Sequence, residues 1–175
     1  MSINNEMIKT GEIRIIENND EIAWTVLGSC ISVVFFTELN LSLICHAQMP
    51  SRSKFDKVCS DNCPHPCFNL LPDTHDFKYV NCSVEYMINV LKKRHINLQH
   101  VKTTLIGGSS VLNIGMPGKT IGEQNIELAR EILSRNKITI NRELIGERDG
   151  ITFWFNPANN GIKYRKHSEE KKRIL

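Results

Sequence analysis

The stretch that decides the fold runs from Thr25-Val-Leu-Gly-Ser-Cys30 to His46, and it contains two apolar runs joined by a short polar link. Ile31–Phe36 and residues 41–45 are rich in β-branched and aromatic side chains and have the length of strands. The link between them, residues 37–40, is short enough for a hairpin. We therefore predict a β-hairpin whose first strand begins beside the point at which the second strand ends.

This hairpin brings two reactive side chains together. Cys30 stands at the start of the first strand and His46 follows the second, so antiparallel pairing places them near each other. The thiolate is the nucleophilic form of cysteine, and a nearby imidazole can accept the thiol proton. Gly28 and Ser29 precede the cysteine, and backbone N–H groups at a tight turn can bind a developing oxyanion. The pattern predicts a Cys–His dyad for acyl chemistry; the alternative is an inert buried cysteine beside a structural histidine.

The bulk properties exclude several classes of protein. A chain of 175 residues with an ordinary globular composition favours a single domain over residues 1–175. A net charge of +3 is too small to indicate binding to nucleic acid. We find no apolar run near the length of a membrane span and no secretory signal segment, so we expect a cytoplasmic protein without membrane insertion. Its six cysteines are then expected to be reduced thiols, catalytic groups or metal ligands rather than disulfides.

A segment rich in cysteine and proline follows the hairpin. Residues 49–76 contain four of the six prolines and no sustained periodicity, which predicts a long irregular loop. Within it, Cys59, Cys63 and Cys67 form a C-x3-C-x3-C array that includes His65. Four such ligands suffice for a structural zinc ion in a loop without a core of its own. Because the spacing differs from the usual C-x2-C, the alternative is a metal-free loop with scattered thiols.

The rest of the chain combines further strands with two main helices. Apolar residues at helical spacing predict a helix that ends near residues 92–94 and a second that starts at a capping box formed by Thr120 and Glu123. Further strands are predicted at residues 13–16, 22–27, 102–106, 137–141, 151–155 and 162–165. The polar ends, residues 1–12 and 166–175, are expected to be loose tails. Strands outnumber helices and several follow one another through tight turns, which indicates a mixed α/β sandwich rather than a parallel βαβ fold.

Gly107 and Gly108 follow the strand predicted at residues 102–106. They lack both the lysine and the glycine spacing of phosphate-binding loops. We expect them to form a tight strand exit that borders the active site.

Together, these motifs resemble those of the chemotaxis receptor glutamine deamidases, the CheD family. The resemblance rests on Leu27-Gly-Ser-Cys30, on His46, on Gly107-Gly108 and on Ile121-Gly-Glu-Gln-Asn125, and it extends from about residue 13 to residue 165. It implies an α/β/β sandwich of mixed, mainly antiparallel sheets with two main helices. It also implies hydrolysis of specific glutamine side chains of methyl-accepting chemotaxis receptors to glutamate, through a thioester and without a cofactor.

The resemblance further implies a role for each residue of the site. Cys30 is the nucleophile, and His46 is the general base and acid. The third member in the family is a threonine six positions before the cysteine, where this chain has Trp24, while Thr25 stands one position nearer. Because a one-residue step along a strand reverses the side chain's face, we expect Thr25 to take this role only through a β-bulge or a shifted register.

The resemblance also bears on partners. Several members of the family bind a CheC-type phosphatase, so such a partner is implied besides the receptors. Two alternatives to an active deamidase stay open. One is a weakly active or inactive family member that acts by binding that phosphatase, and the other is a zinc- or redox-responsive module built on the cysteine-rich loop.

Overall fold

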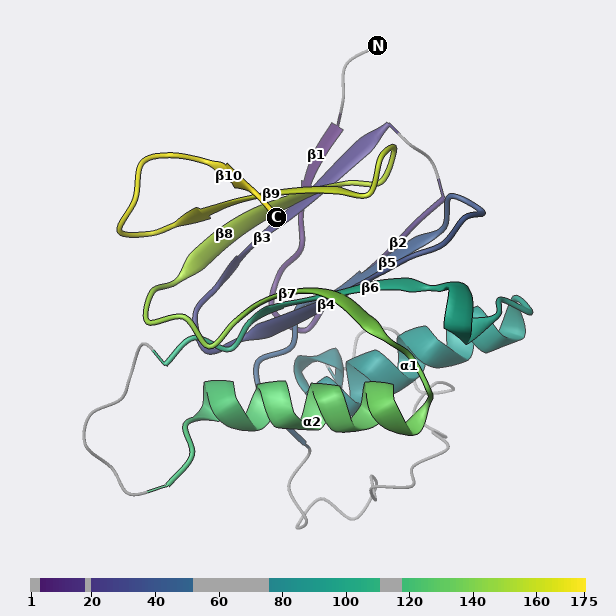
Figure 1. The fold of residues 1–175 in the computed structure, drawn as a ribbon, viewed down its shortest axis with the longest axis horizontal. Coiled ribbons are helices and arrows are strands. Elements are labelled where there is room, and N and C mark those ends of the chain that lie inside the picture. The colour runs from purple at the N-terminus through teal and green to yellow at the C-terminus, as the bar shows by residue number, and fades with distance from the viewer. Residues whose placement is uncertain (1–3, 18–19, 52–75, 111–117) are drawn as a thin grey trace.

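The structure, a computed structural model, describes residues 4–17, 20–51, 76–110 and 118–175. Its elements form three layers, which are a pair of helices, a central five-stranded sheet and an outer five-stranded sheet (Figure 1). Most neighbouring strands are antiparallel, and each sheet contains one parallel pair, β6 with β7 and β1 with β3. This α/β/β arrangement confirms the expected fold class.

The central sheet carries the predicted hairpin. Its strands, in spatial order, are β2 (Ile13–Ile16), β5 (Ser42–Cys45), β4 (Ile31–Phe36), β6 (Lys102–Gly107) and β7 (Ile140–Ile145). β4 and β5 pair antiparallel with Val34 opposite Ile44, and an isolated bridge between Ile31 and Ala47 extends the pairing toward Cys30. The hairpin prediction is therefore confirmed.

The outer sheet includes both ends of the described chain. Its strands, in spatial order, are β1 (Asn4–Met7), β3 (Glu21–Leu27), β8 (Ile151–Asn156), β9 (Gly161–Lys166) and β10 (Arg173–Ile174). β1 and β10 lie in the two segments that we expected to be loose tails, and that expectation is wrong for these residues. Each of the two strands pairs with an edge whose backbone groups would otherwise lack partners in the sheet, and Ile8, just after β1, is buried.

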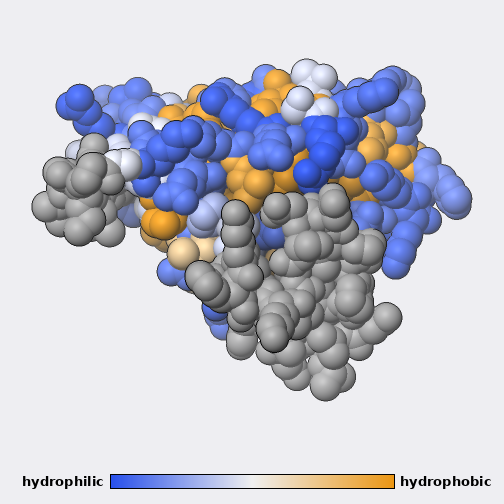
Figure 2. Space-filling view, turned by 90° about the horizontal axis from the view of Figure 1, so that it is seen from below, coloured by the Kyte–Doolittle hydropathy of each residue, from blue (hydrophilic) through white to orange (hydrophobic). Residues whose placement is uncertain are grey.

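The helices α1 (Val80–Lys93) and α2 (Ile121–Arg135) lie side by side on the central sheet (Figure 1). The predicted capping box is present, since Thr120 Oγ1 accepts from the N–H of Glu123 while the Glu123 carboxylate accepts from the N–H of Thr120. Short 3-10 helices, η2 (Asp76–Lys78) and η3 (Leu98–His100), flank α1. Polar residues cover much of the face seen from the helix side, with apolar patches between them (Figure 2). Among the helices that the structure describes, none is both long and apolar enough to cross a membrane.

The strand predicted at residues 137–141 starts later, at Ile140. Lys137 has a positive φ of 56°, which ends the helical path after α2. The N–H of Ile138 then donates to the carbonyl of Leu133, which closes the last turn of the helix. The end of α2 therefore uses residues that the apolar pattern assigns to a strand.

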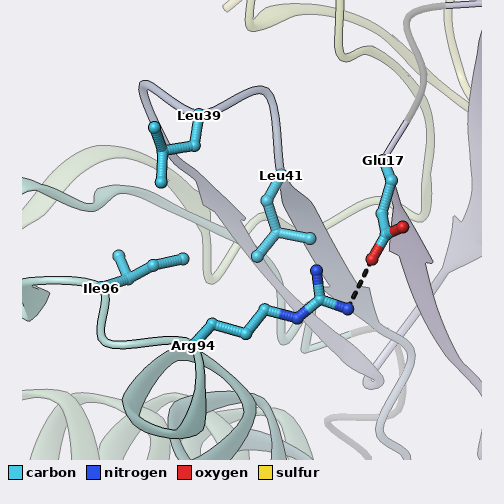
Figure 3. A pocket seen from close by; sticks show the side chains of 5 residues that line it. All are labelled: Glu17, Leu39, Leu41, Arg94 and Ile96. Carbon is cyan, nitrogen blue, oxygen red and sulfur yellow. Dashed lines mark ion pairs between the residues drawn. The ribbon is translucent and has the colours of Figure 1, made fainter.

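A pocket of about 270 Å³ lies at the hairpin tip, at the opposite end of β4 from Cys30 (Figure 3). Leu39, Leu41 and Ile96 line it, together with the ion pair between Arg94 and Glu17. These lining residues include no thiol, hydroxyl or imidazole, so the pocket offers no nucleophile. The chemistry suggested by Cys30 therefore belongs to the other end of the hairpin.

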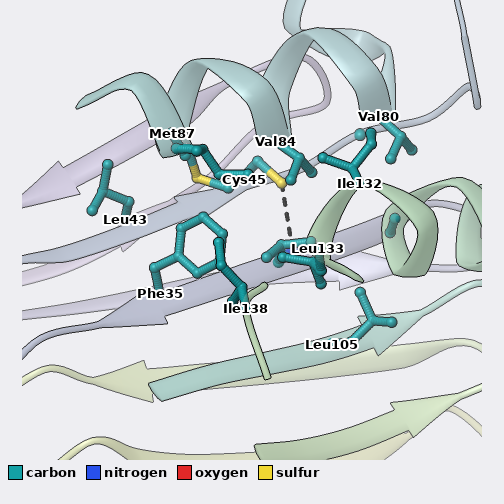
Figure 4. Packing of buried hydrophobic residues seen from close by; sticks show 14 of the residues in the cluster. Phe35, Leu43, Cys45, Val80, Val84, Met87, Leu105, Ile132, Leu133 and Ile138 are labelled. Carbon is teal, nitrogen blue, oxygen red and sulfur yellow. Dashed lines mark hydrogen bonds between the residues drawn. The ribbon is translucent and has the colours of Figure 1, made fainter. Parts of the chain in front are cut away.

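Two apolar cores hold the layers together. The core between the helices and the central sheet includes Phe35, Leu105, Met87 and Ile132 (Figure 4). Cys45 is fully buried in it. The second core fills the space between the two sheets and includes Leu27, Val34, Ile106, Phe153 and Phe155. Because side chains alternate along a strand, successive residues of β4 enter the two cores in turn.

Candidate active site

Thr25 lies on the inner face of the outer sheet. It is completely buried, whereas Trp24 and Val26 on either side of it are more exposed. The pairing of β3 with β8 keeps one register along residues 23–27, with Thr25 opposite Phe153. Thr25 therefore points between the sheets from a regular strand without a β-bulge at residues 23–27, and its role in catalysis stays a prediction.

His46 follows β5 and lies against Thr25. Its Nδ1 atom is 2.8 Å from Thr25 Oγ1, and the residue is only 5% exposed. The backbone of His46 is held on both sides, since its N–H donates to the carbonyl of Glu12 at 3.0 Å and its carbonyl accepts from the N–H of Gly11 at 2.8 Å. The contact between the two side chains thus joins the outer sheet to the central one.

The hydrogen bonds around the imidazole determine which nitrogen carries the proton. Thr25 Oγ1 donates its single proton to the carbonyl of Ile8 at 2.7 Å, so it acts as an acceptor toward His46 Nδ1. The Ile8 carbonyl, 3.4 Å from Nδ1, is a second acceptor on the same side. Neutral His46 therefore carries its proton on Nδ1, and the lone pair is on Nε2, which lies 3.4 Å from Thr10 Oγ1. The ring is arranged to act as a base at Nε2.

Burial lowers the pKa of His46 below its ordinary value of 6.5. The Ile8 carbonyl and the charge of Glu12 act in the opposite direction, but burial has the larger effect. At neutral pH the imidazole is therefore uncharged and able to accept a proton.

We expect the free energy of unfolding to fall as the pH drops below 6.5, because burial depresses the pKa of His46 in the folded state. Between the folded and unfolded pKa values the unfolded chain binds more protons, so acid favours unfolding. This stability is fully present above the unfolded value and is lost as the pH falls through the folded one. Urea denaturation between about pH 7.5 and about pH 5 measures the effect.

Substitution by glutamine, whose side chain does not titrate, provides both the test and the control. The variant His46→Gln is expected to show a flatter pH dependence of stability than the wild type. His100→Gln, at an exposed position in η3, is expected to keep the wild-type slope. Equal slopes in the wild type and His46→Gln would contradict the prediction.

Cys30 lies on the same face of the central sheet as His46. Ile31 and Ala47 exchange both backbone hydrogen bonds, at 2.8 and 2.9 Å, and both belong to the core under the helices. Their neighbours Cys30 and His46 therefore face the outer sheet. In this register Cys30 stands opposite Gln48, and His46 is its diagonal neighbour, a position that separates Cα atoms by roughly 7–8 Å. No hydrogen bond joins Cys30 Sγ to His46 in the part of the chain that the structure describes; such contacts often tighten when substrate binds.

Burial raises the pKa of the Cys30 thiol above its ordinary value of 9.0. The group is therefore a neutral thiol at rest, and it needs a base before it can attack. Cys45 differs, because complete burial raises its pKa to about 11. Of these two thiols, only Cys30 combines partial exposure with a nearby imidazole.

The exit of β6 packs directly against the turn that carries Cys30. Gly107 has a φ of 108°, and a Cβ atom on it would lie 2.3 Å from the carbonyl oxygen of Cys30. The N–H of Gly108 donates to that same oxygen at 2.7 Å, and the N–H of Ser109 donates to the carbonyl of Gly28 at 2.8 Å. Both glycines thus border the turn, and the lack of a side chain on Gly107 permits the close approach.

Comparison with known proteins identifies the family. The model of the CheD family, described as CheD chemotactic sensory transduction, matches residues 69–166, which is more than half of the chain. The chain belongs to the CheD family. Its similarity to CheD proteins also includes the segment before residue 69, since alignments with individual relatives cover most of the chain.

Three CheD relatives show how far the similarity extends. A probable chemoreceptor glutamine deamidase CheD 2 of Geobacter sulfurreducens is 26% identical over 85% of this chain and 81% of its own length. A probable chemoreceptor glutamine deamidase CheD of Clostridium tetani is 21% identical over 94% of this chain and 93% of its own length. Another, of Oceanobacillus iheyensis, is 25% identical over 97% of this chain and 96% of its own length. Among solved structures, the hypothetical protein YfiH of Bacillus licheniformis is 10% identical over 77% of this chain and 50% of its own, with a TM-score of 0.47.

The structure adds three residues to the site of this CheD chain that sequence reasoning missed. Ile8 and Thr10 contact His46, but the polar N-terminal segment gave no sign of this. Asn125 had no assigned role, although it donates from Nδ2 to the carbonyls of Ser29 at 2.9 Å and Gln48 at 3.0 Å. A signal for Asn125 was present, because it is a polar residue on the apolar face of α2.

The predicted zinc ligands of this CheD chain lie outside the described residues. Cys59, Cys63, His65 and Cys67 all belong to residues 52–75. The irregular loop expected at residues 49–76 falls almost entirely in the same segment. A structural zinc ion in this segment stays a prediction from the sequence.

Proposed function

We propose that the chain is a cysteine-dependent protein-glutamine deamidase that converts glutamine side chains of methyl-accepting chemotaxis receptors to glutamate. Membership of the CheD family and the names of the relatives support the reaction and the substrate. The observation that carries the proposal is the contact between Thr25 Oγ1 and His46 Nδ1, which leaves Nε2 unprotonated on a histidine that shares one face of the central sheet with Cys30. Such an arrangement supplies the base that a neutral thiol requires.

In the first half of the proposed reaction, ammonia leaves. His46 Nε2 takes the thiol proton, and Cys30 Sγ attacks the amide carbon of the glutamine side chain. The negative charge that develops on the amide oxygen is stabilised by backbone N–H groups of the turn that carries Cys30. The carbon–nitrogen bond then breaks as the imidazolium of His46 gives its proton to the leaving nitrogen, which departs as ammonia. A thioester between Cys30 and the substrate remains.

In the second half, water replaces the thiol. His46 Nε2 accepts a proton from water while the oxygen attacks the thioester carbon. The carbon–sulfur bond breaks, the proton returns to Cys30 Sγ, and a glutamate side chain is released. These steps use only side chains, backbone groups and water. The product carries a new negative charge on a receptor helix, where like charges repel their neighbours.

The proposed reaction also implies where this protein acts and which proteins it binds. The reaction takes place in the cytoplasm, where the sequence leads us to expect this protein. Because the substrate is one exposed side chain on a large partner, a shallow site suffices, and membrane insertion is not needed. A CheC-type phosphatase as a second partner remains an expectation from the resemblance.

Mass spectrometry of receptor fragments tests the proposal directly. We expect wild-type protein to convert particular glutamines in the cytoplasmic fragments of chemotaxis receptors from the same genome to glutamate, with release of one ammonia per conversion. Protein whose thiols have been blocked with iodoacetamide is the matched control and is expected to leave the glutamines intact. Unconverted glutamines in every receptor fragment after incubation with active, folded protein would overturn the proposal.

A further inference from the structure

Asn125 makes one of the longest-range polar contacts of the described chain. It is completely buried, and its Nδ2 group donates to the carbonyls of Ser29 and Gln48, residues that are far from it in sequence. These two carbonyls belong to opposite sides of the site, one next to Cys30 and the other two residues after His46. The amide orientation is set by chemistry, because a flipped Oδ1 would face two carbonyl oxygens without a proton between them.

Asn125 reaches this place because α2 approaches the exit of β6 very closely. A Cβ atom on Gly122 would lie 2.5 Å from the carbonyl oxygen of Gly108, and one on Gly108 would lie 2.5 Å from Ile126 Cγ1. Gly122 and Asn125 are three residues apart and therefore share a face of the helix. The two glycines allow the helix to lie against the turn that carries Cys30.

The contact with Ser29 determines the direction of a neighbouring N–H group. A peptide unit is planar and trans, so its C=O and N–H point in opposite directions. Because the carbonyl of Ser29 points toward Asn125, the N–H of Cys30 in the same unit points away from α2. The Gln48–Met49 unit behaves in the same way, since its carbonyl faces Asn125 while the N–H of Met49 donates to the carbonyl of Lys78 at 2.9 Å.

The N–H of Cys30 is left available by this arrangement. The three carbonyls of the turn, those of Gly28, Ser29 and Cys30, are each held by a donor. Within the described ranges, by contrast, no other residue accepts a hydrogen bond from the N–H of Cys30, which faces the thiol of Cys30 itself. An N–H on the nucleophile's own residue that is bound to no other residue is the usual type of donor for an oxyanion in acyl transfer.

Only one of the two polar atoms of the Asn125 side chain takes part in these hydrogen bonds. Oδ1 of Asn125 is buried and has no hydrogen-bond partner in the described part of the chain. An orphaned buried acceptor is unfavourable, and an apolar side chain would avoid it. The two donated bonds are therefore the reason for an asparagine at this position.

We infer that Asn125 is a positioning residue, which holds the Ser29–Cys30 peptide so that the N–H of Cys30 serves as an oxyanion donor for an acyl substrate. This inference rests on the role of Cys30 as nucleophile in the proposed function. Asn125 itself does not touch the substrate. It acts through the backbone of the nucleophile, and it links that backbone to the segment that follows His46.

Two reactions of the same thiol separate positioning from general structural support. Acylation of Cys30 by p-nitrophenyl acetate passes through an oxyanion, whereas alkylation by iodoacetamide does not. Both are followed on the Cys30 peptide by mass spectrometry. For Asn125→Ala we expect acylation to slow by about 10²-fold, while alkylation keeps its wild-type rate. Asn125→Asp keeps the shape of the side chain but has no donor, and it is expected to show the same slower acylation and unchanged alkylation.

Asn136→Ala removes an asparagine at the other end of α2, where Nδ2 donates to the carbonyl of Ile132, and it is expected to leave both rates unchanged. An equal decrease of both rates in the folded Asn125 variants would overturn the inference, as would unchanged acylation or a wild type that is not acylated. Receptor glutamines that stay unconverted while the ratio of the two rates still falls would count against the proposed function alone.

Discussion

Replacement of Cys30 by alanine is expected to lower the rate of receptor deamidation on the order of 10⁴-fold or more, because no other group can form the thioester. The side chain is small and only partly buried, so the variant is expected to stay folded. Single-turnover deamidation of a receptor fragment by wild type and Cys30→Ala, with glutamate formation measured by mass spectrometry, gives the ratio directly. Thermal unfolding of both proteins shows whether the loss of rate comes from the site.

A second cysteine serves as the matched control for this prediction. Cys45 has the same chemistry but lies in the core under the helices, where its Sγ accepts a hydrogen bond from the N–H of Val33 at 3.4 Å. Cys45→Ala is expected to lower the stability of the protein and to leave the rate per folded molecule unchanged. If Cys30→Ala retained the wild-type rate, or if Cys45→Ala lost it while folded, the assignment of the nucleophile would be wrong.

The sequence predicted the hairpin and its chemistry because both depend on local pattern. The apolar runs on either side of residues 37–40 set the register, and the register alone brings His46 near Cys30. The structure adds the direction of Thr25, which depends on which face of β3 turns inward. Alternation along the strand is visible in the sequence, but the identity of the inner face depends on the partner sheet.

The contacts made by the N-terminal segment were not predictable from local pattern. Residues 1–12 are polar, and β1 is a short strand that forms only because the edge of β3 is available to it. The carbonyl of Ile8, which accepts the hydrogen bond from Thr25, reaches the site through that pairing. Asn125 contacts the turn for a similar reason, since the approach of α2 depends on the packing of Gly108 against Gly122. A single sequence does not show which distant backbone groups meet, even where a polar residue on the apolar face of a helix, as at Asn125, marks one of the partners.

Replacement of His46 by alanine is expected to lower the rate of deamidation by about 10²–10⁴-fold, the usual contribution of a general base. The effect is large because burial holds the pKa of the Cys30 thiol above its ordinary value, so little thiolate exists without a base. The same cause gives the variant a distinct pH profile. Its residual rate is expected to rise with pH toward the pKa of the thiol, whereas the wild-type rate is expected to stay level above the lowered pKa of His46. Rates measured from about pH 6 to about pH 9 separate the two profiles.

Variants of Thr25 test whether the orientation of the imidazole matters as well as its presence. Thr25→Val removes the nearer of the two acceptors for the proton on His46 Nδ1 and keeps the volume of the side chain. It is expected to slow deamidation by about fivefold, the equivalent of one hydrogen bond of about 1 kcal/mol. Thr25→Ser keeps the hydroxyl and is expected to stay near the wild-type rate. A wild-type rate in Thr25→Val would show that the tautomer of His46 does not depend on this contact, and a level pH profile in His46→Ala would show that another group is the base.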